Sequence, residues 1–215
     1  SFDTAIFKII GRADLEEIKK TKRLSENPFN PKRRRNSVLV KISDKKYLVV
    51  RGAQESVLPY VKNLNKEDEE KIMKWIWREG KKGRRVIAIA KREFDKDSYD
   101  VKDEEESMEF EGMISFSDPI KPSAKEAVKK AKNLGIELKI ITGDSTEVAG
   151  AVAYEVGISR SSAEVISGFD FENLSLEEKK EAVEKFNVFS RVSPEQKFQI
   201  IELLQKKHTV GYLGD

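Results

Sequence analysis

The chain has 215 residues, 38% of them hydrophobic, so it is long enough to bury one large core or two small ones. Charged residues make up 37% but nearly balance at a net charge of +3, which argues against a dedicated nucleic-acid binder. The absence of cysteine excludes disulfides and thiolate metal sites, and the single histidine, His208, excludes a histidine-cluster metal site. With no signal peptide and no apolar run near the roughly 20 residues that span a bilayer, we expect a soluble protein.

The first half of the chain is predicted to form strands around one helix. Strands are expected over residues 37–42 and 47–50, joined as a hairpin by the turn residues between them. Apolar residues at helical spacing predict a helix over residues 66–79, capped by Gly80. A further strand is expected over residues 86–90.

A polar, turn-rich segment over residues 91–109 follows, with an acidic run at residues 103–106. Such a run is typical of a solvated linker. We therefore predict a domain boundary here, which divides the chain into residues 1–108 and 109–215.

The second half alternates strands and helices, a pattern typical of a parallel, doubly wound sheet. Two of its helices are predicted to open with capping boxes, at Ser175 and Ser193. The predicted strands are 112–116, 136–141, 188–189 and 208–213, and the predicted helices are 122–134, 146–156, 175–186 and 194–207.

Two of the predicted strands lead into a glycine followed by an aspartate. One ends in Thr142-Gly143-Asp144 and the other in Gly214-Asp215. Open α/β sheets bind ligands at the carboxyl ends of their strands, where a helix N-terminus suits phosphate. Two carboxylates at that edge suit Mg²⁺, although a plain helix cap is the alternative for either aspartate taken alone.

Three further charged residues accompany these strand ends. Lys197 lies one turn into a predicted helix and offers a point charge to phosphate, with Arg191 just before that helix. Asp118 follows a predicted strand and is held by Pro119 and Pro122. Each residue alone is equally well explained as a surface cation or a rigid turn.

The first half carries features that suit a nucleotide. Phe29 offers a ring on which a purine could stack, although a core or surface-covering role is the alternative. Residues 32–35 are four consecutive cations before a strand, so alternate side chains should point to opposite faces, and a nucleic-acid patch or localisation signal is the alternative. Arg51 and Gly52 follow the next strand, where glycine allows close backbone approach. Together they predict a sheet cleft with an aromatic platform and a cationic rim.

These residues together resemble the cytoplasmic part of a P-type cation-transporting ATPase, over nearly the whole chain. In the second half, Thr142-Gly143-Asp144 matches the family's Thr-Gly-Asp motif, and Asp118-Pro119 with Lys121 resembles its Asp-Pro-Pro-Arg motif. Residues 191–197 match the segment that carries the family's phosphate-site lysine. Gly214-Asp215 resembles the start of its Gly-Asp-Gly-x-Asn-Asp motif.

The first half resembles the family's nucleotide-binding domain. The combination of motifs looks most like the magnesium-transporting branch, with the proton-pumping branch as the alternative. By resemblance, Phe29 falls where adenine stacks, Arg34 where a basic residue contacts nucleotide, Arg51-Gly52-Ala53 in a Lys-Gly-Ala-Pro-Glu-like motif, Arg85 as the phosphate-facing cation, and Asp3-Thr4-Ala5 in the acidic segment near the adenine.

The resemblance implies an α/β fold: an α+β antiparallel-sheet nucleotide-binding domain, then part of a haloacid-dehalogenase-like doubly wound parallel sheet. It implies ATP as the ligand and Mg²⁺ as the metal. The implied catalytic residues are Thr142, Gly143, Asp144 and Lys197, the implied metal ligand is Asp215, and the implied nucleotide-binding residues are Asp3, Phe29, Arg34, Arg51, Gly52, Arg85, Asp118 and Arg191.

The family's phosphorylated aspartate lies in Asp-Lys-Thr-Gly-Thr, and the sequence lacks this motif. We therefore expect a fragment that binds ATP-Mg²⁺ weakly and forms no phosphoenzyme, with an incomplete parallel sheet and an exposed edge. Its partners by resemblance are the actuator and membrane domains of a parent protein, whose transmembrane helices carry the cation and whose cytoplasmic face this part occupies. No nucleic-acid partner is expected.

Two other functions stay open from the sequence. One is a soluble haloacid-dehalogenase-type phosphatase, which would also need a nucleophilic aspartate. The other is a binding module without catalysis, either for nucleotide alone or for nucleic acid through residues 32–35, where clustered aromatic partners are lacking.

Overall fold

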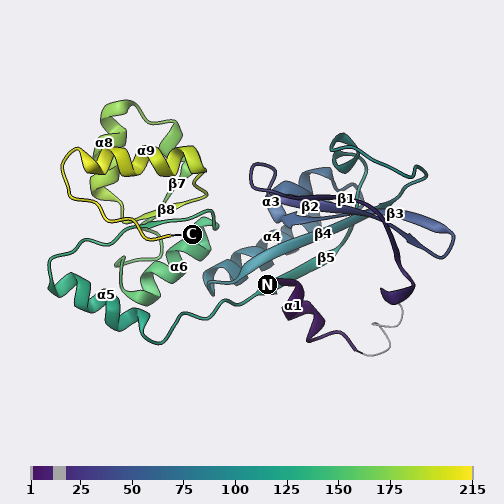
Figure 1. The fold of residues 1–215 in the computed structure, drawn as a ribbon, viewed down its shortest axis with the longest axis horizontal. Helices are drawn as coiled ribbons and strands as arrows, with labels where there is room; N and C mark the ends of the chain where they lie inside the picture. The colour runs from purple at the N-terminus through teal and green to yellow at the C-terminus, as the bar shows by residue number, and fades with distance from the viewer. Residues whose placement is uncertain (1, 12–17, 215) are drawn as a thin grey trace. The chain divides into compact units, whose positions relative to one another are not determined.

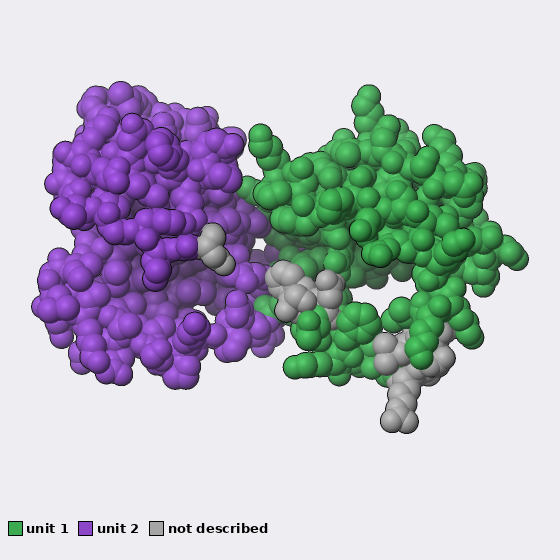
Figure 2. All heavy atoms as spheres, in the orientation of Figure 1, with its two compact units in different colours: residues 1–74, 86–116 green, residues 75–85, 117–215 purple. Residues whose placement is uncertain are grey.

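The computed structural model of the protein describes residues 2–11 and 18–214. Two compact units make up the chain, and Figure 2 shows them in separate colours. Unit 1 comprises residues 1–74 and 86–116, and unit 2 comprises residues 75–85 and 117–215. Each unit has hydrophobic clusters of its own. The domain boundary predicted at residues 108 and 109 stays a prediction.

Unit 1 is built on a five-stranded sheet in the order β1-β2-β3-β4-β5 (Figure 1). The first three neighbouring pairs are antiparallel, and the predicted hairpin is confirmed between β2 and β3. Leu39 and Leu48 pair across it with no exposed surface, as alternation in a half-buried sheet requires. The strands are β1 (Lys22–Asn30), β2 (Arg35–Ile42), β3 (Lys45–Ala53), β4 (Arg85–Glu93) and β5 (Glu109–Phe116).

Short helices connect these strands, apart from the long α4 (Lys66–Lys81), whose last residues belong to unit 2. The predicted helix is confirmed but the predicted cap is wrong, because Gly80 lies inside α4. A Cβ at Gly80 would lie 2.8 Å from the Cβ of Glu147, so close packing explains this glycine. The other helices are α1 (Phe2–Phe7), α3 (Gln54–Val57), and the 3₁₀ turns η1 (Leu58–Tyr60) and η2 (Lys102–Glu105).

The segment over residues 91–109 is not the solvated linker that its composition predicted. Phe94 is buried and packs edge-on against Tyr99, with ring centroids 6.5 Å apart. In the acidic run, η2 turns Glu104 inward, where it has no exposed surface. The strand expected at residues 112–116 is also longer and differently placed, since β5 borders β4 in the sheet of unit 1.

Unit 2 holds a three-stranded parallel sheet in the order β6-β8-β7, with helices on both faces (Figure 1). Successive residues of β8 point to opposite faces: Val188 packs against α6 and Phe189 against α8 and α9. The elements are α5 (Ala124–Asn133), β6 (Ile140–Ile141), α6 (Thr146–Val156), β7 (Ile166–Ser167), α7 (Gly168–Glu172), α8 (Leu176–Lys185), β8 (Val188–Ser190) and α9 (Pro194–Gln205).

The helices of unit 2 agree with the sequence pattern better than its strands. Both predicted capping boxes are confirmed, at Ser175 with Glu178 and at Ser193 with Gln196. The strand predicted over residues 136–141 shrinks to two residues, and residues 208–213 form no strand.

Missing ladder partners explain both corrections, because a strand exists only beside another strand. β6 pairs with β8 along one edge, and in the described part of the chain no strand borders its other edge.

No candidate for a membrane-spanning helix is found among the residues that the structure describes.

Candidate functional site

The predicted nucleotide residues of unit 1 gather at one end of its sheet. The strand register lines up one residue from each of β1 to β4 as neighbours in a row. Four predicted residues lie in this row or one position from it: Phe29, Arg34, Arg51 and Gly52. The row consists of Asn30, Arg35, Gly52 and Ala88.

Phe29 is the penultimate residue of β1, beside this row, and 61% of its surface is exposed, so the core role is wrong and its ring is open to a ligand. The turn after it is tightly tied: the Oδ1 atom of Asn30 accepts from the backbone N–H groups of Lys32 and Arg33, at 2.9 and 3.1 Å. Arg34 closes the turn with a φ of 52°, a left-handed conformation that is uncommon outside glycine.

The four cations of residues 32–35 do not form one patch. Arg33 and Arg35 both bind Glu104, with N···O distances of 2.5 and 3.0 Å. Arg34 reaches Glu55 at 3.4 Å and keeps about a third of its side chain exposed. Residues 32–34 lie in the turn before β2, so the turn rather than strand alternation separates the outward Arg34 from the inward Arg33 and Arg35.

Arg51 and Gly52 complete this end of the sheet. The Nε group of Arg51 donates to Oδ1 of Asn36, its cross-strand neighbour, at 3.1 Å. A Cβ at Gly52 would lie 2.5 Å from the carbonyl oxygen of Arg34. The backbone that closely approaches this glycine is therefore the protein's own β1–β2 turn.

In unit 2, Thr142-Gly143-Asp144 forms a closed turn after β6. The carbonyl oxygens of Thr142 and Asp144 accept from the backbone N–H groups of Val192 and Arg191, at 3.1 and 2.9 Å. The Arg191 guanidinium donates to the carbonyl of Gly143 at 3.2 Å. The structure thus brings together four of the predicted residues, and the hydroxyl of Thr142 accepts the N–H of Asp144 at 3.1 Å.

Arg85 joins this turn through a bidentate ion pair with Asp144. Its Nε and Nη2 groups donate to the two carboxylate oxygens at 2.8 and 3.0 Å, and its Nη1 group donates to the carboxylate of Asp118 at 3.2 Å. The hydrogen bond to Asp144 raises the pKa of Arg85 above its ordinary value. A planar guanidinium fork suits carboxylate and phosphate oxygens alike.

Lys197 lies in the first turn of α9, the helix that follows Val192. Its Nζ atom is 5.0 Å from the ring centroid of Tyr212, a cation–π contact. Two predicted residues fall outside what the structure describes: Asp215 altogether, and Asp3 in its side chain. Among the described residues no three acids or histidines cluster as a metal site.

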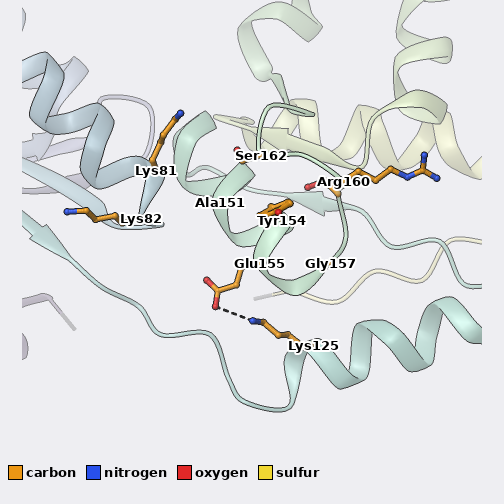
Figure 3. Close-up of a pocket in the computed structure, with 10 residues that line it drawn as sticks. Lys81, Lys82, Lys125, Ala151, Tyr154, Glu155, Gly157, Arg160 and Ser162 are labelled. Atoms are coloured by element: carbon orange, nitrogen blue, oxygen red, sulfur yellow. Dashed lines mark ion pairs between the residues drawn. The ribbon is translucent and has the colours of Figure 1, made fainter.

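A pocket of about 790 Å³ lies beside α6 in unit 2, and none of the predicted residues lines it. Figure 3 shows Lys125 and Glu155 pointing toward one another there, joined by an ion pair of 3.6 Å. Lys82 pairs with Glu79 at 2.8 Å, and the Nζ atom of Lys81 lies 4.0 Å from the ring centroid of Trp77. These cations already have partners, so the pocket is a weak candidate for binding an anion.

The residue that sequence reasoning missed is Glu104. The sequence held part of the signal, because it has one run of four cations, residues 32–35, and two runs of four acids, residues 67–70 and 103–106. Two runs of equal and opposite charge can bind each other instead of solvent. In the structure Arg35 binds both Glu104 and Glu105.

Comparison with known proteins identifies a family model and several relatives. The family model described as P-type ATPase, cytoplasmic domain N, matches residues 1–123. The chain is 35% identical over 206 residues to the Magnesium-transporting ATPase, P-type 1, of Salmonella typhimurium, covering 88% of this chain and 22% of that protein. It is 29% identical over 203 residues to Calcium-transporting ATPase 1 of Bacillus cereus, covering 90% of this chain and 23% of that protein. The chain therefore spans less than a quarter of the length of these relatives.

Proposed function

Because the chain belongs to the P-type ATPases through their cytoplasmic domain N, we propose that it is an ATP-binding part of a cation-transporting ATPase. The observation that carries the proposal is the gathering of Phe29, Arg34, Arg51 and Gly52 at one end of the sheet of unit 1. An exposed ring beside outward cations suits a purine nucleotide, since every base can stack on an aromatic face.

We assign the adenine end of ATP to unit 1. The exposed ring of Phe29 is its platform, and Arg34 offers charge beside it. Arg51 is held at the same end of the sheet by Asn36. In this proposal Asp3 also contributes to the adenine end, while Gly52 serves indirectly, by letting the turn that carries Arg34 pack against β3.

We assign the phosphate chemistry to unit 2. Arg85 binds Asp144 and Asp118 in the structure, and its fork can exchange a carboxylate for a phosphate oxygen. Thr142, Gly143 and Asp144 are held in place by the backbone of residues 191 and 192, which suits a reaction that depends on positioning and electrostatics. Lys197 would offset phosphoryl charge once it leaves the ring of Tyr212.

The donor atoms of this edge fit Mg²⁺, which prefers hard oxygen ligands and is commonly held by one or two carboxylates together with substrate phosphates. Asp144 and Asp215 are the residues that would hold the ion. When bound, Mg²⁺ supplies charge neutralisation for the phosphates.

We further propose that unit 2 is part of a larger haloacid-dehalogenase-like sheet. Its parallel strands, its helices on both faces and the unpartnered edge of β6 among the described residues support this. The sequence lacks Asp-Lys-Thr-Gly-Thr, so this chain alone would form no aspartyl phosphate. Covalent label from γ-labelled ATP on the purified chain would contradict that statement.

The parent protein in this proposal is a membrane pump for a divalent cation, with this part on the cytoplasmic face. Relatives named for magnesium and for calcium transport support the class, and the 35% identity to the Salmonella typhimurium protein makes Mg²⁺ the first ion to test. The actuator and membrane domains of that parent would be its partners. A nucleotide-binding module without catalysis is the second candidate, favoured by the missing nucleophile motif.

The experiment is a calorimetric ATP titration of the chain and of two variants. We expect Phe29→Ala to weaken binding about tenfold, because base–aromatic stacking contributes about 1–3 kcal/mol. Phe169→Ala is the matched control, since Phe169 is also largely exposed but lies in unit 2. Equal affinities for all three proteins, or no binding by the unchanged chain, would contradict the proposal.

A further inference from the structure

Glu104 lies at the centre of a buried polar network in unit 1. Its side chain has no exposed surface. Oε2 accepts hydrogen bonds from Arg33 at 2.5 Å and Arg35 at 3.0 Å. Oε1 accepts from the hydroxyl of Ser37 at 2.6 Å and from the amide of Asn27 at 3.1 Å. Because four donors bind this one buried carboxylate, Glu104 holds the surrounding segments in place.

The two arginines that Glu104 holds are the neighbours of Arg34. Arg35 is itself buried, and its remaining donors reach Glu105 and the carbonyl of Ser56, the latter at 3.2 Å. Because a buried ion pair is stable only while both partners are present, the network keeps Arg33 and Arg35 directed inward.

With its neighbours fixed, Arg34 has little freedom left. Its carbonyl oxygen accepts from the backbone N–H of Ala53 at 3.0 Å and from the hydroxyl of Ser56 at 3.2 Å. Its φ of 52° is one that an arginine adopts only when the surrounding structure imposes it. The Arg34 side chain therefore leaves the network and reaches Glu55.

The same acid also holds the other strand of this hairpin. Asn27, which binds Glu104 through its side chain, donates its backbone N–H to the hydroxyl of Tyr99 at 2.8 Å. Phe29 follows two residues later in β1. Glu104 thus connects the strand that carries Phe29 with the segment that carries Arg34.

We propose that Glu104 is a positioning residue for nucleotide binding by unit 1. It touches no nucleotide, and it acts by fixing the β1–β2 hairpin so that Phe29 and Arg34 face outward together. This inference rests on the proposed ATP-binding function.

The test compares the ATP dissociation constants of Glu104→Gln and Glu106→Gln in the 215-residue chain. Both variants lose one negative charge, but the side chain of Glu106 is 67% exposed. We expect Glu104→Gln to weaken ATP binding about tenfold and Glu106→Gln to stay within about twofold of the unchanged chain. Circular dichroism checks that each variant is folded. If Glu104→Gln does not fold, Arg33→Met replaces it in the test, with an expected loss of ATP affinity of about threefold.

A double-mutant cycle with Arg34→Met separates positioning from a general effect on the fold. If Glu104 acts through Arg34, the double variant loses far less affinity than the product of the two single losses. A fully multiplicative loss in this cycle and in the same cycle with Phe29→Ala overturns the positioning role. An unchanged affinity in both Glu104→Gln and Arg33→Met overturns this inference alone, whereas failure of the unchanged chain to bind ATP overturns the proposed function and this inference with it.

Discussion

At the scale of single residues, the candidate site of unit 2 depends on one guanidinium. Arg85 holds Asp144 by two hydrogen bonds, and the two side chains are 40% and 26% exposed. Their partial burial and bidentate geometry favour a coupling larger than that of an ordinary surface pair.

We predict a coupling of about 1 kcal/mol in the free energy of unfolding from the double-mutant cycle of Arg85→Met and Asp144→Asn. Urea unfolding of the four proteins measures it. Additive single effects would mean that this ion pair is not formed in solution.

A second residue-scale prediction concerns pH. Burial raises the pKa of Tyr99 above its ordinary value, outweighing its hydrogen bonds with the Ser37 hydroxyl and the Asn27 backbone N–H. A raised folded-state pKa stabilises the protein fully below the unfolded pKa of about 10, and this stabilisation is lost as the pH rises through the folded value. The difference in unfolding free energy between the unchanged chain and Tyr99→Phe should therefore be constant from pH 7 to about 9.5 and narrow above about pH 10. A difference that does not change with pH would contradict the assigned burial.

At the scale of elements, the packing of β3 against the β1–β2 turn depends on Gly52. An added methyl group would lie 2.5 Å from the Arg34 carbonyl oxygen and 2.5 Å from the Arg35 Cβ. Neither the turn that carries Arg34 nor the strand that carries Arg35 can move away freely. We predict that Gly52→Ala costs about 3 kcal/mol of unfolding free energy. Gly211→Ala is the control, with nothing within 4 Å of its added Cβ and an expected change within about 0.5 kcal/mol. Chemical denaturation measures both, and equal stabilities would show that the turn lies farther from β3.

Elements whose signals are local were predictable from the sequence. The capping boxes at Ser175 and Ser193 need only residues three apart, and both are present as expected. The strand predicted at residues 208–213 is absent, because an apolar run becomes a strand only when a neighbour supplies its hydrogen bonds. The same reason shortens the strand before Thr142 to two residues.

At the scale of the whole molecule, the sequence showed local motifs but not the distant residues that they contact. The motif around Asp144 was evident, but its partner Arg85 lies 59 residues away in the chain. The acidic run was taken for a linker because local composition does not show that Glu104 meets arginines about 70 residues earlier. Long-range charge pairing is a property of the fold, and only matched runs of opposite charge hint at it beforehand.

The measurement that tests the central claim most directly is an ATP titration of the isotope-labelled chain followed by ¹H–¹⁵N NMR. The account predicts that, within unit 1, the largest shift changes fall on the backbone amides of Phe29, Arg34, Arg51 and Gly52, at one end of its sheet. Changes confined to the pocket beside α6, or no changes at all, would contradict it.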